Sequence, residues 1–235
     1  MSNNPYKTRE GGATVTIFVP YDCHNNCPFC VNKEEYQNTE GFSVDKIIES
    51  IRIMNEITPY CDFVFTGGEP FANLGSLQKM IDEIPNTHKL YINTTFPVFK
   101  DRTEKDMLDF VERNKEKITC INISRHLQKF VEESSDELIS QIPVATRVNC
   151  LLYKNYPVDK LVDYVKRFEK YNIPIQFRFD YTETTPENLY EEENDQILTD
   201  LKRLFKYTGL DGCRMRCGYH LSFIILKSYN DVKVT

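Results

Sequence analysis

The sequence predicts an α/β fold built on parallel strands. Short runs rich in β-branched and aromatic residues alternate with longer segments whose apolar residues recur at helical spacing, and six such pairs follow one another. Strands that alternate with helices form parallel sheets with right-handed crossovers, so a doubly wound sheet and a barrel both fit the pattern. No glycine-rich dinucleotide-binding turn follows the first strand, which favours a barrel or a partial barrel.

Each element has its own local signal. The first strand is the β-branched run TVTIFV, and Ser43 can cap the helix that follows it. Glycine and proline then end several of the later elements, because neither residue continues a helix or strand well. The predicted strands are 14–19, 61–66, 89–95, 118–124, 145–153 and 175–182, and the predicted helices are 43–57, 74–84, 102–114, 134–142, 158–171 and 194–209.

Composition limits the class of protein. A chain of 235 residues with 40% hydrophobic residues can form one large domain. Its net charge of −6 argues against a dedicated nucleic-acid binder, which usually has a basic face. The sequence shows no signal peptide and no apolar run long enough to cross a membrane, so we expect a cytoplasmic protein. In that reducing compartment, eight cysteines indicate metal or redox chemistry rather than disulfides.

Three cysteines lie within eight residues, directly after the first predicted strand. Cys23, Cys27 and Cys30 have the spacing C-x3-C-x2-C. Three thiolates can hold three corners of a cubane iron–sulfur cluster and leave the fourth iron open. The alternative is structural zinc, which is almost always closed by four ligands and would need a fourth such as His24 or His220.

A second motif, TGGEP at 66–70, ends the second predicted strand. In barrel folds the loops after the strands gather at one face, where active sites form, so both motifs are expected at one site. Together, the cysteine spacing, the aromatic Phe29 before the third cysteine, and GGEP resemble the signature of the radical S-adenosylmethionine (radical SAM) superfamily. The resemblance covers about residues 13–182.

The resemblance implies a fold, cofactors and an activity. It implies a TIM-like partial (β/α)6 barrel, placed here at 13–209 between a lead at 1–12 and a short C-terminal extension at 210–235, where the chain is possibly truncated. It implies an oxygen-sensitive enzyme with a [4Fe–4S] cluster on Cys23, Cys27 and Cys30. This enzyme would take an electron from a donor such as flavodoxin or ferredoxin and cleave S-adenosylmethionine to a 5′-deoxyadenosyl radical, which abstracts hydrogen from a substrate. The open iron then binds S-adenosylmethionine instead of His24, and four residues of the loop become spacers around the cluster: Asp22, His24, Asn25 and Asn26.

Further site residues follow from the resemblance and from strand position. Acceptors for the ammonium of S-adenosylmethionine are the backbone of Gly67 and Gly68 with Glu69, while Pro70 stiffens the turn. Other candidates for cofactor contact are Phe29, Asn93, Thr94, Ser124, Arg147 and Asn149. Substrate-side candidates are Arg125, His126, Arg178 and Asp180.

For some of these further residues a purely structural role is the alternative. Arg125 and His126 depart from the Ser-x-Asp that many relatives have at this point, and they can equally be surface residues opening a loop. Arg147 and Asn149 can be satisfied polar residues of the core.

The remaining cysteines fall into two groups. Cys61, Cys120 and Cys150 stand alone in predicted strands and are expected to pack in the core. Cys213 and Cys217 are too few for an auxiliary cluster unless a distant cysteine joins them.

The substrate stays open between a small metabolite or nucleotide, a peptide and a glycyl-radical enzyme partner. Arginines in SRH, FRFD and CRMRC favour an anionic small molecule or nucleotide. A non-enzymatic zinc-binding module is a remote alternative.

Overall fold

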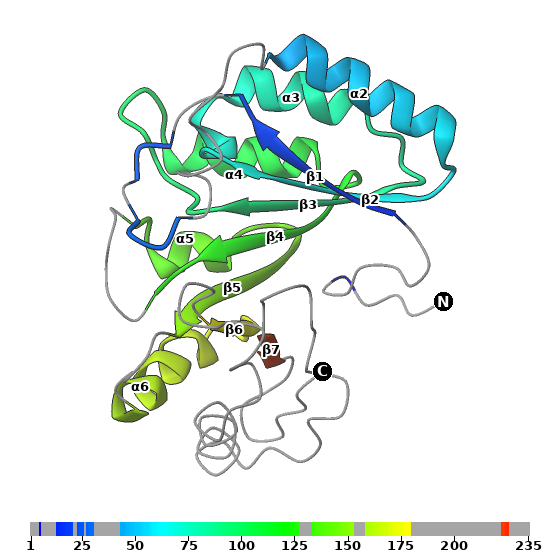
Figure 1. Cartoon of the computed structure of the whole chain (residues 1–235). Coiled ribbons are helices and arrows are strands. Elements are labelled where there is room, and N and C mark those ends of the chain that lie inside the picture. Colours follow the sequence, from blue (N-terminus) through cyan, green and yellow to red (C-terminus); the bar gives the residue numbers. More distant parts are fainter. Residues whose placement is uncertain are drawn as a thin grey trace. The chain divides into compact units, whose positions relative to one another are not determined.

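The computed structural model describes residues 5, 13–20, 23–25, 27–30, 43–126, 133–152, 158–179 and 222–225 (Figure 1). The chain divides into two compact units. The first comprises Met1–Ile123 and Phe130–Thr146, and the second comprises Ser124–Lys129 and Arg147–Thr235.

The first unit is built on parallel strands that neighbour one another in chain order. These are β1 (Ala13–Val19), β2 (Cys61–Gly67), β3 (Lys89–Thr94) and β4 (Ile118–Ser124), which belongs to this unit as far as Ile123. β1 pairs with β2, β2 with β3 and β3 with β4, all in parallel. Val19 is in register with Gly67, and Thr94 is in register with Ile123. The carboxyl ends of β1, β2 and β3, and the loops that follow these three strands, therefore share one edge.

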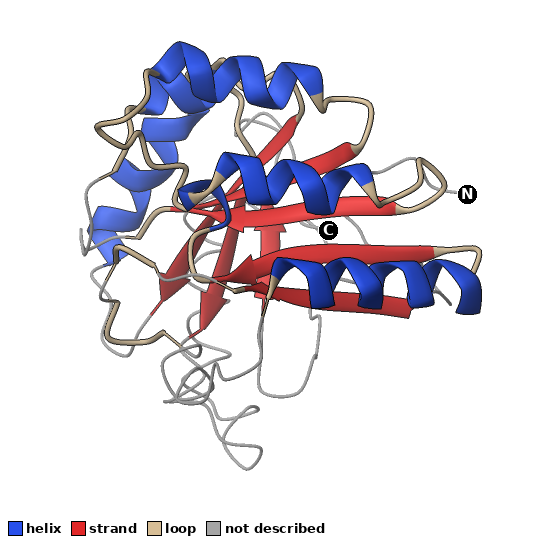
Figure 2. Cartoon of the chain, turned by 90° about the horizontal axis from the view of Figure 1, so that it is seen from above, coloured by secondary structure: helices blue, strands red, loops and turns tan. Residues whose placement is uncertain are grey.

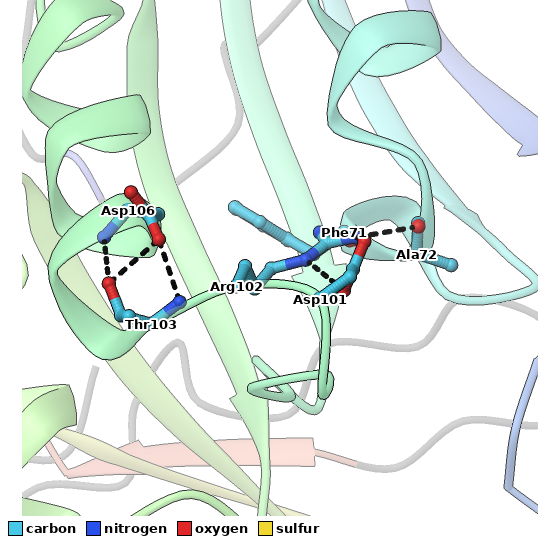
Figure 3. A network of polar contacts seen from close by, with 6 residues as sticks. All are labelled: Phe71, Ala72, Asp101, Arg102, Thr103 and Asp106. Atoms are coloured by element: carbon cyan, nitrogen blue, oxygen red, sulfur yellow. Dashed lines mark hydrogen bonds and ion pairs between the residues drawn. The ribbon is translucent and has the colours of Figure 1, made fainter.

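Helices connect the consecutive strands of the first unit (Figure 2). They are α2 (Val44–Ile57), the short 3-10 helix η1 (Pro70–Ala72), α3 (Leu74–Asp82), α4 (Glu104–Arg113) and α5 (Asp136–Ser140). Side chains cap their amino ends: the Ser43 hydroxyl accepts a hydrogen bond from the Lys46 N–H at 3.2 Å, as its place in the sequence predicts. Thr103 and Asp106 form a full capping box at α4 (Figure 3).

Apolar side chains from strands and helices fill the core of this unit. Fully buried examples are Phe63, Phe65, Leu77, Met80, Ile92 and Phe110. The three isolated cysteines Cys61, Cys120 and Cys150 are buried, so the prediction that they pack in the core is confirmed.

The second unit contains the later strands of the seven-stranded sheet that the described residues form. β5 (Ala145–Leu152) enters it at Arg147 and pairs in parallel with β6 (Ile175–Phe179), and β7 (Ser222–Ile225) adds to β6 in antiparallel orientation. Helix α6 (Val158–Glu169) connects β5 to β6 and buries Tyr164 and Phe168.

The predicted alternation is confirmed for six strands and five helices, with small differences at the ends. The fourth predicted helix, 134–142, is shorter in the structure, where α5 covers Asp136–Ser140 after its cap Ser135. β7 was not predicted, because a strand of four residues is too short to show a period. The predicted helix 194–209 lies outside the described residues. None of the described helices is long and apolar enough to cross a membrane.

Candidate functional site

The loop after β1 carries the three cysteines of the motif. Cys30 N–H donates to the Cys27 carbonyl at 3.3 Å, so the second and third cysteines stand on one turn. Neighbouring protein atoms desolvate the Cys23 thiol although part of its surface is exposed, and this desolvation raises its pKa to about 11. The charges of Glu69, Cys27 and Cys30 contribute to this raised pKa, and a hydrogen bond from the Asn25 backbone partly offsets the rise.

The chemistry of this donor set fits an iron–sulfur cluster. Among the described residues no three metal-ligating side chains are gathered closely enough to hold a single metal ion. However, the sequence separation of the cysteines places three thiols on one short loop, and cysteine is the usual ligand of such clusters. A thiol with a raised pKa would become a thiolate on binding iron, because the positive charge of the metal favours the ionised form.

The GGEP loop turns sharply at the end of β2. Gly67 has φ 101°, in the left-handed region that a residue with a side chain rarely adopts, so the turn requires glycine. Pro70 then stands at the start of η1, where the fixed φ of proline is favourable. Glu69 caps η1 and is only 2% exposed, and its Oε1 accepts from the Phe71 N–H at 3.0 Å.

Two threonines at the end of β3 hold the Glu69 carboxylate. The Thr94 hydroxyl donates to Oε1. Thr95 donates twice to Oε2, from its backbone N–H and from its hydroxyl, at 2.9 Å each. With the Phe71 N–H, the carboxylate accepts four hydrogen bonds from the protein, about the capacity of a carboxylate.

The segment between β3 and α4 also holds the carbonyls of η1. The Arg102 guanidinium donates to the carbonyl oxygen of Phe71 at 2.8 Å and to that of Ala72 at 3.2 Å (Figure 3). Asp101 pairs with the same guanidinium at 3.0 Å, and the Phe99 ring centroid lies 5.1 Å from its central carbon. Asp101 and Phe99 orient Arg102. The guanidinium therefore holds the carboxyl end of η1, whereas Glu69 caps the amino end.

The cysteine loop contacts this segment at two points. The Asn25 side-chain amide donates to the Thr95 hydroxyl at 3.2 Å. The His24 ring packs edge-on against Phe99, with centroids 4.9 Å apart and planes at 76°. Asn25 and His24 were interpreted as spacers, and this interpretation is wrong for both, since each makes a specific contact that positions the loop.

In the second unit, Arg125 lies at the centre of a buried polar cluster. The residue is 0% exposed, and its Nη1 donates to the Ser124 carbonyl at 2.9 Å. Its backbone N–H donates to the Asn149 carbonyl at 2.9 Å, and its own carbonyl accepts from the Tyr164 hydroxyl at 2.8 Å. The alternative that Arg125 is a surface residue is therefore wrong.

His126 is a neutral acceptor beside this cluster. Its Nδ1 accepts from the Leu151 N–H at 3.1 Å. Burial, together with the positive charge of Arg125, lowers the pKa of His126 to about 4, so the ring is uncharged at neutral pH. Arg147 and Asn149 are also buried, at 6% and 7% exposure, and Asn149 Oδ1 has no hydrogen-bond partner among the described residues.

The other predicted site residues are placed as follows. Asn93 is half-buried on β3 and accepts from the Asn122 amide at 2.8 Å across to β4. Phe29 is half-buried in the cysteine turn. Arg178 lies on β6 in register with Leu151, while Asp180 lies outside the described residues, as do Cys213 and Cys217.

The comparisons with known proteins agree with these motifs. A family model described as a 4Fe-4S single cluster domain matches residues 10–115, which contain both the cysteine motif and GGEP. A solved structure titled "Native anSMEcpe with bound AdoMet and Cp18Cys peptide" matches with a TM-score of 0.59 and 20% identity, over 83% of this chain and 59% of that one. SuiB from Streptococcus suis, bound to precursor peptide SuiA, matches with a TM-score of 0.58 and 15% identity, over 82% of this chain and 46% of that one.

The likeness to these solved structures shows a shared fold. The likeness also confirms the predicted fold class, an α/β partial barrel. The chain spans about half the length of these solved structures. A search of curated proteins found no match.

Sequence reasoning missed two residues of this candidate site. Thr95 directly follows the predicted contact Thr94, but nothing in its local sequence distinguishes it from a residue that simply ends a strand. Arg102 opens the predicted helix 102–114, yet in the structure it precedes the cap Thr103 and reaches back to η1. The available signal was position alone, because both residues follow β3 at the edge where the two motif loops lie.

Proposed function

We propose that this chain is a radical SAM enzyme that reductively cleaves S-adenosylmethionine at a [4Fe–4S] cluster and uses the resulting radical to abstract hydrogen from a substrate. The observation that carries the proposal is that Asn25 of the cysteine loop and Glu69 of the GGEP loop bind the same hydroxyl, that of Thr95. A loop suited to a cluster and a loop suited to the cofactor are thereby held together.

In this proposal each loop has one task. Cys23, Cys27 and Cys30 would hold the cluster, which when bound supplies the electron that cleaves the sulfonium. The GGEP loop would present backbone carbonyls to the cofactor's ammonium, since the left-handed turn at Gly67 allows close approach of the backbone. A cytoplasmic location and a flavodoxin- or ferredoxin-like donor belong to the same proposal, because the cluster is oxygen-sensitive and needs an electron.

For the substrate we favour an anionic small molecule or a nucleotide. The second unit buries two guanidinium side chains, Arg125 and Arg147, together with the Asn149 amide. Guanidinium groups recognise carboxylate and phosphate in a bidentate manner, and burial strengthens such pairs. Peptide modification is the second candidate, favoured by the peptides bound in the structures of anSMEcpe and SuiB.

Anaerobic reconstitution tests the proposed function. The chain is incubated with iron and sulfide, and absorption near about 400 nm and iron content are measured. Reduced protein is then incubated with S-adenosylmethionine, and 5′-deoxyadenosine is quantified in the presence of a panel of carboxylates, nucleotides and peptides. We expect cluster absorption and cofactor cleavage, with a mass shift in one class of the panel.

Matched cysteine variants provide the control. Cys27→Ala should lose the cluster, whereas Cys120→Ala, which removes a buried thiol outside the motif, should keep it. One tightly held zinc without colour, or equal cluster loss in the two variants, would contradict the proposal.

A further inference from the structure

We propose that Thr95 is a positioning residue that locks the cysteine loop to the GGEP loop, and so sets the place of the cofactor relative to the cluster. This inference rests on the proposed function. Thr95 is 9% exposed, and it makes three hydrogen bonds to these loops: one from Asn25 and two to Glu69.

The direction of the hydrogen bonds follows from the groups themselves. The Asn25 Nδ2 can only donate, and an ionised Glu69 carboxylate can only accept. The single hydroxyl proton of Thr95 must therefore point to Glu69 while its oxygen accepts from Asn25. The resulting chain runs from amide to hydroxyl to carboxylate, an arrangement in which each bond polarises and strengthens the next.

The Glu69 side chain is committed to this lock. Its two oxygens accept four hydrogen bonds from Phe71, Thr94 and Thr95, and its backbone carbonyl accepts from the Ala72 N–H at 2.8 Å. A carboxylate with about four acceptor sites has no capacity left for the ammonium of a cofactor. The glutamate of GGEP therefore shapes the loop, and contacts to the ammonium fall to the backbone of the turn.

An unusual backbone conformation brings two consecutive threonines to one carboxylate. Successive side chains of a strand point to opposite faces, so Thr94 and Thr95 can meet Glu69 together only if the strand ends between them. β3 ends at Thr94, and Phe96 has φ 51°, a conformation that a bulky residue rarely adopts.

Local contacts support the strained residue. The Phe96 N–H donates to the Thr94 hydroxyl at 2.7 Å, and its fully buried ring packs edge-on against Phe71, with centroids 5.0 Å apart. Strained backbone of this kind persists where the surrounding structure holds it, and it clusters at functional sites.

The lock matters because reacting groups must be held within a fraction of an ångström of their productive geometry. The cysteine loop would carry the cluster, and the GGEP loop would carry the cofactor. Loss of the Thr95 hydroxyl should leave the cysteine loop and the GGEP loop intact but poorly aligned with each other. We expect weaker cofactor binding and slower cleavage with an unchanged cluster content.

The test compares Thr95→Val with Thr95→Ser. Valine keeps the branched shape and the backbone N–H bond to Glu69 but removes the hydroxyl, whereas serine keeps the hydroxyl. After reconstitution, iron content, the KM for S-adenosylmethionine and the electron paramagnetic resonance spectrum of the reduced cluster are measured with and without S-adenosylmethionine.

For Thr95→Val we expect the iron content of the wild type, a KM raised roughly tenfold and a smaller spectral change on cofactor addition. Thr95→Ser should stay close to the wild type. Wild-type KM and spectra in Thr95→Val would overturn the inference, as would equal impairment of the two variants.

A second measurement does not depend on the cluster. Hydrogen–deuterium exchange of the reduced apoprotein follows the peptides that contain residues 23–30 and 94–97. We expect faster exchange in Thr95→Val and in Asn25→Ala. The double variant should exchange no faster than Thr95→Val, because that substitution already removes the acceptor of the Asn25 bond. If exchange is unchanged in the variants, the lock is refuted, whether or not the protein makes 5′-deoxyadenosine. If exchange is altered but the wild type does not cleave S-adenosylmethionine, only the proposed function is refuted.

Discussion

Replacing Glu69 by glutamine should destabilise the protein far more than the same substitution at an exposed glutamate. Glutamine keeps one acceptor oxygen, so two of the four hydrogen bonds at Glu69 lose their acceptor. In one orientation of the glutamine amide, the Phe71 N–H and the Thr94 hydroxyl lose their acceptor oxygen. In the other orientation, the N–H and the hydroxyl of Thr95 lose theirs. A hydroxyl can turn to accept from the new amide, but a backbone N–H cannot.

Either orientation therefore leaves one buried backbone N–H without an acceptor. That loss costs about 1–3 kcal/mol, and the remaining bonds weaken because the acceptor is no longer charged. We expect the free energy of unfolding to fall by about 3 kcal/mol, a large share of the typical stability of a domain.

The measurement is urea unfolding of the reduced apoprotein, followed by circular dichroism. The control is Glu83→Gln, which removes an ion pair with Arg52 at 2.7 Å whose side chains are 62% exposed for Arg52 and 28% for Glu83. Exposed pairs contribute at most about 1 kcal/mol. Equal losses of free energy in the two variants would refute the reasoning that Glu69 is a buried hub.

Two further predictions concern the backbone and the pH dependence. Gly67→Ala should destabilise the protein by about 1–2 kcal/mol because of the left-handed turn, whereas Gly75→Ala in α3 should stabilise it by roughly 0.5–1 kcal/mol, since the new methyl group meets only Asn73 Oδ1 at 3.6 Å. Thermal unfolding checks the pair, and a tolerated Gly67→Ala would contradict the turn. Because the pKa of His126 is about 4 when folded and about 6.5 when unfolded, only the unfolded state binds a proton between these values, so stability should fall as the pH drops through this window, by up to about 1.4 kcal/mol per pH unit. His126→Asn, whose amide oxygen can still accept from Leu151, should flatten that slope, and a slope identical to the wild type would show that another group causes it.

Local sequence patterns determined the order and type of the elements. The cysteine motif and GGEP each lie within a few consecutive residues, so both could be recognised without a structure. The isolated cysteines could be assigned to the core because each stands alone in a predicted strand, away from other metal-ligating residues. The sequence could not decide whether Arg125 is buried, because the dipeptide Arg125-His126 also suits a surface loop. The contacts of its backbone with Asn149 and Tyr164 place it in the interior.

The lock between the loops was decided by tertiary structure alone. Asn25 and Thr95 are 70 residues apart, and Glu69 and Thr95 are 26 apart. No periodicity or spacing connects such positions. They meet because β1, β2 and β3 are parallel neighbours, which brings the loops at their carboxyl ends to one edge. The sequence by itself therefore determined the two motifs, the cysteine spacing and GGEP. The pairing of the strands decided which residues hold the two motif loops together.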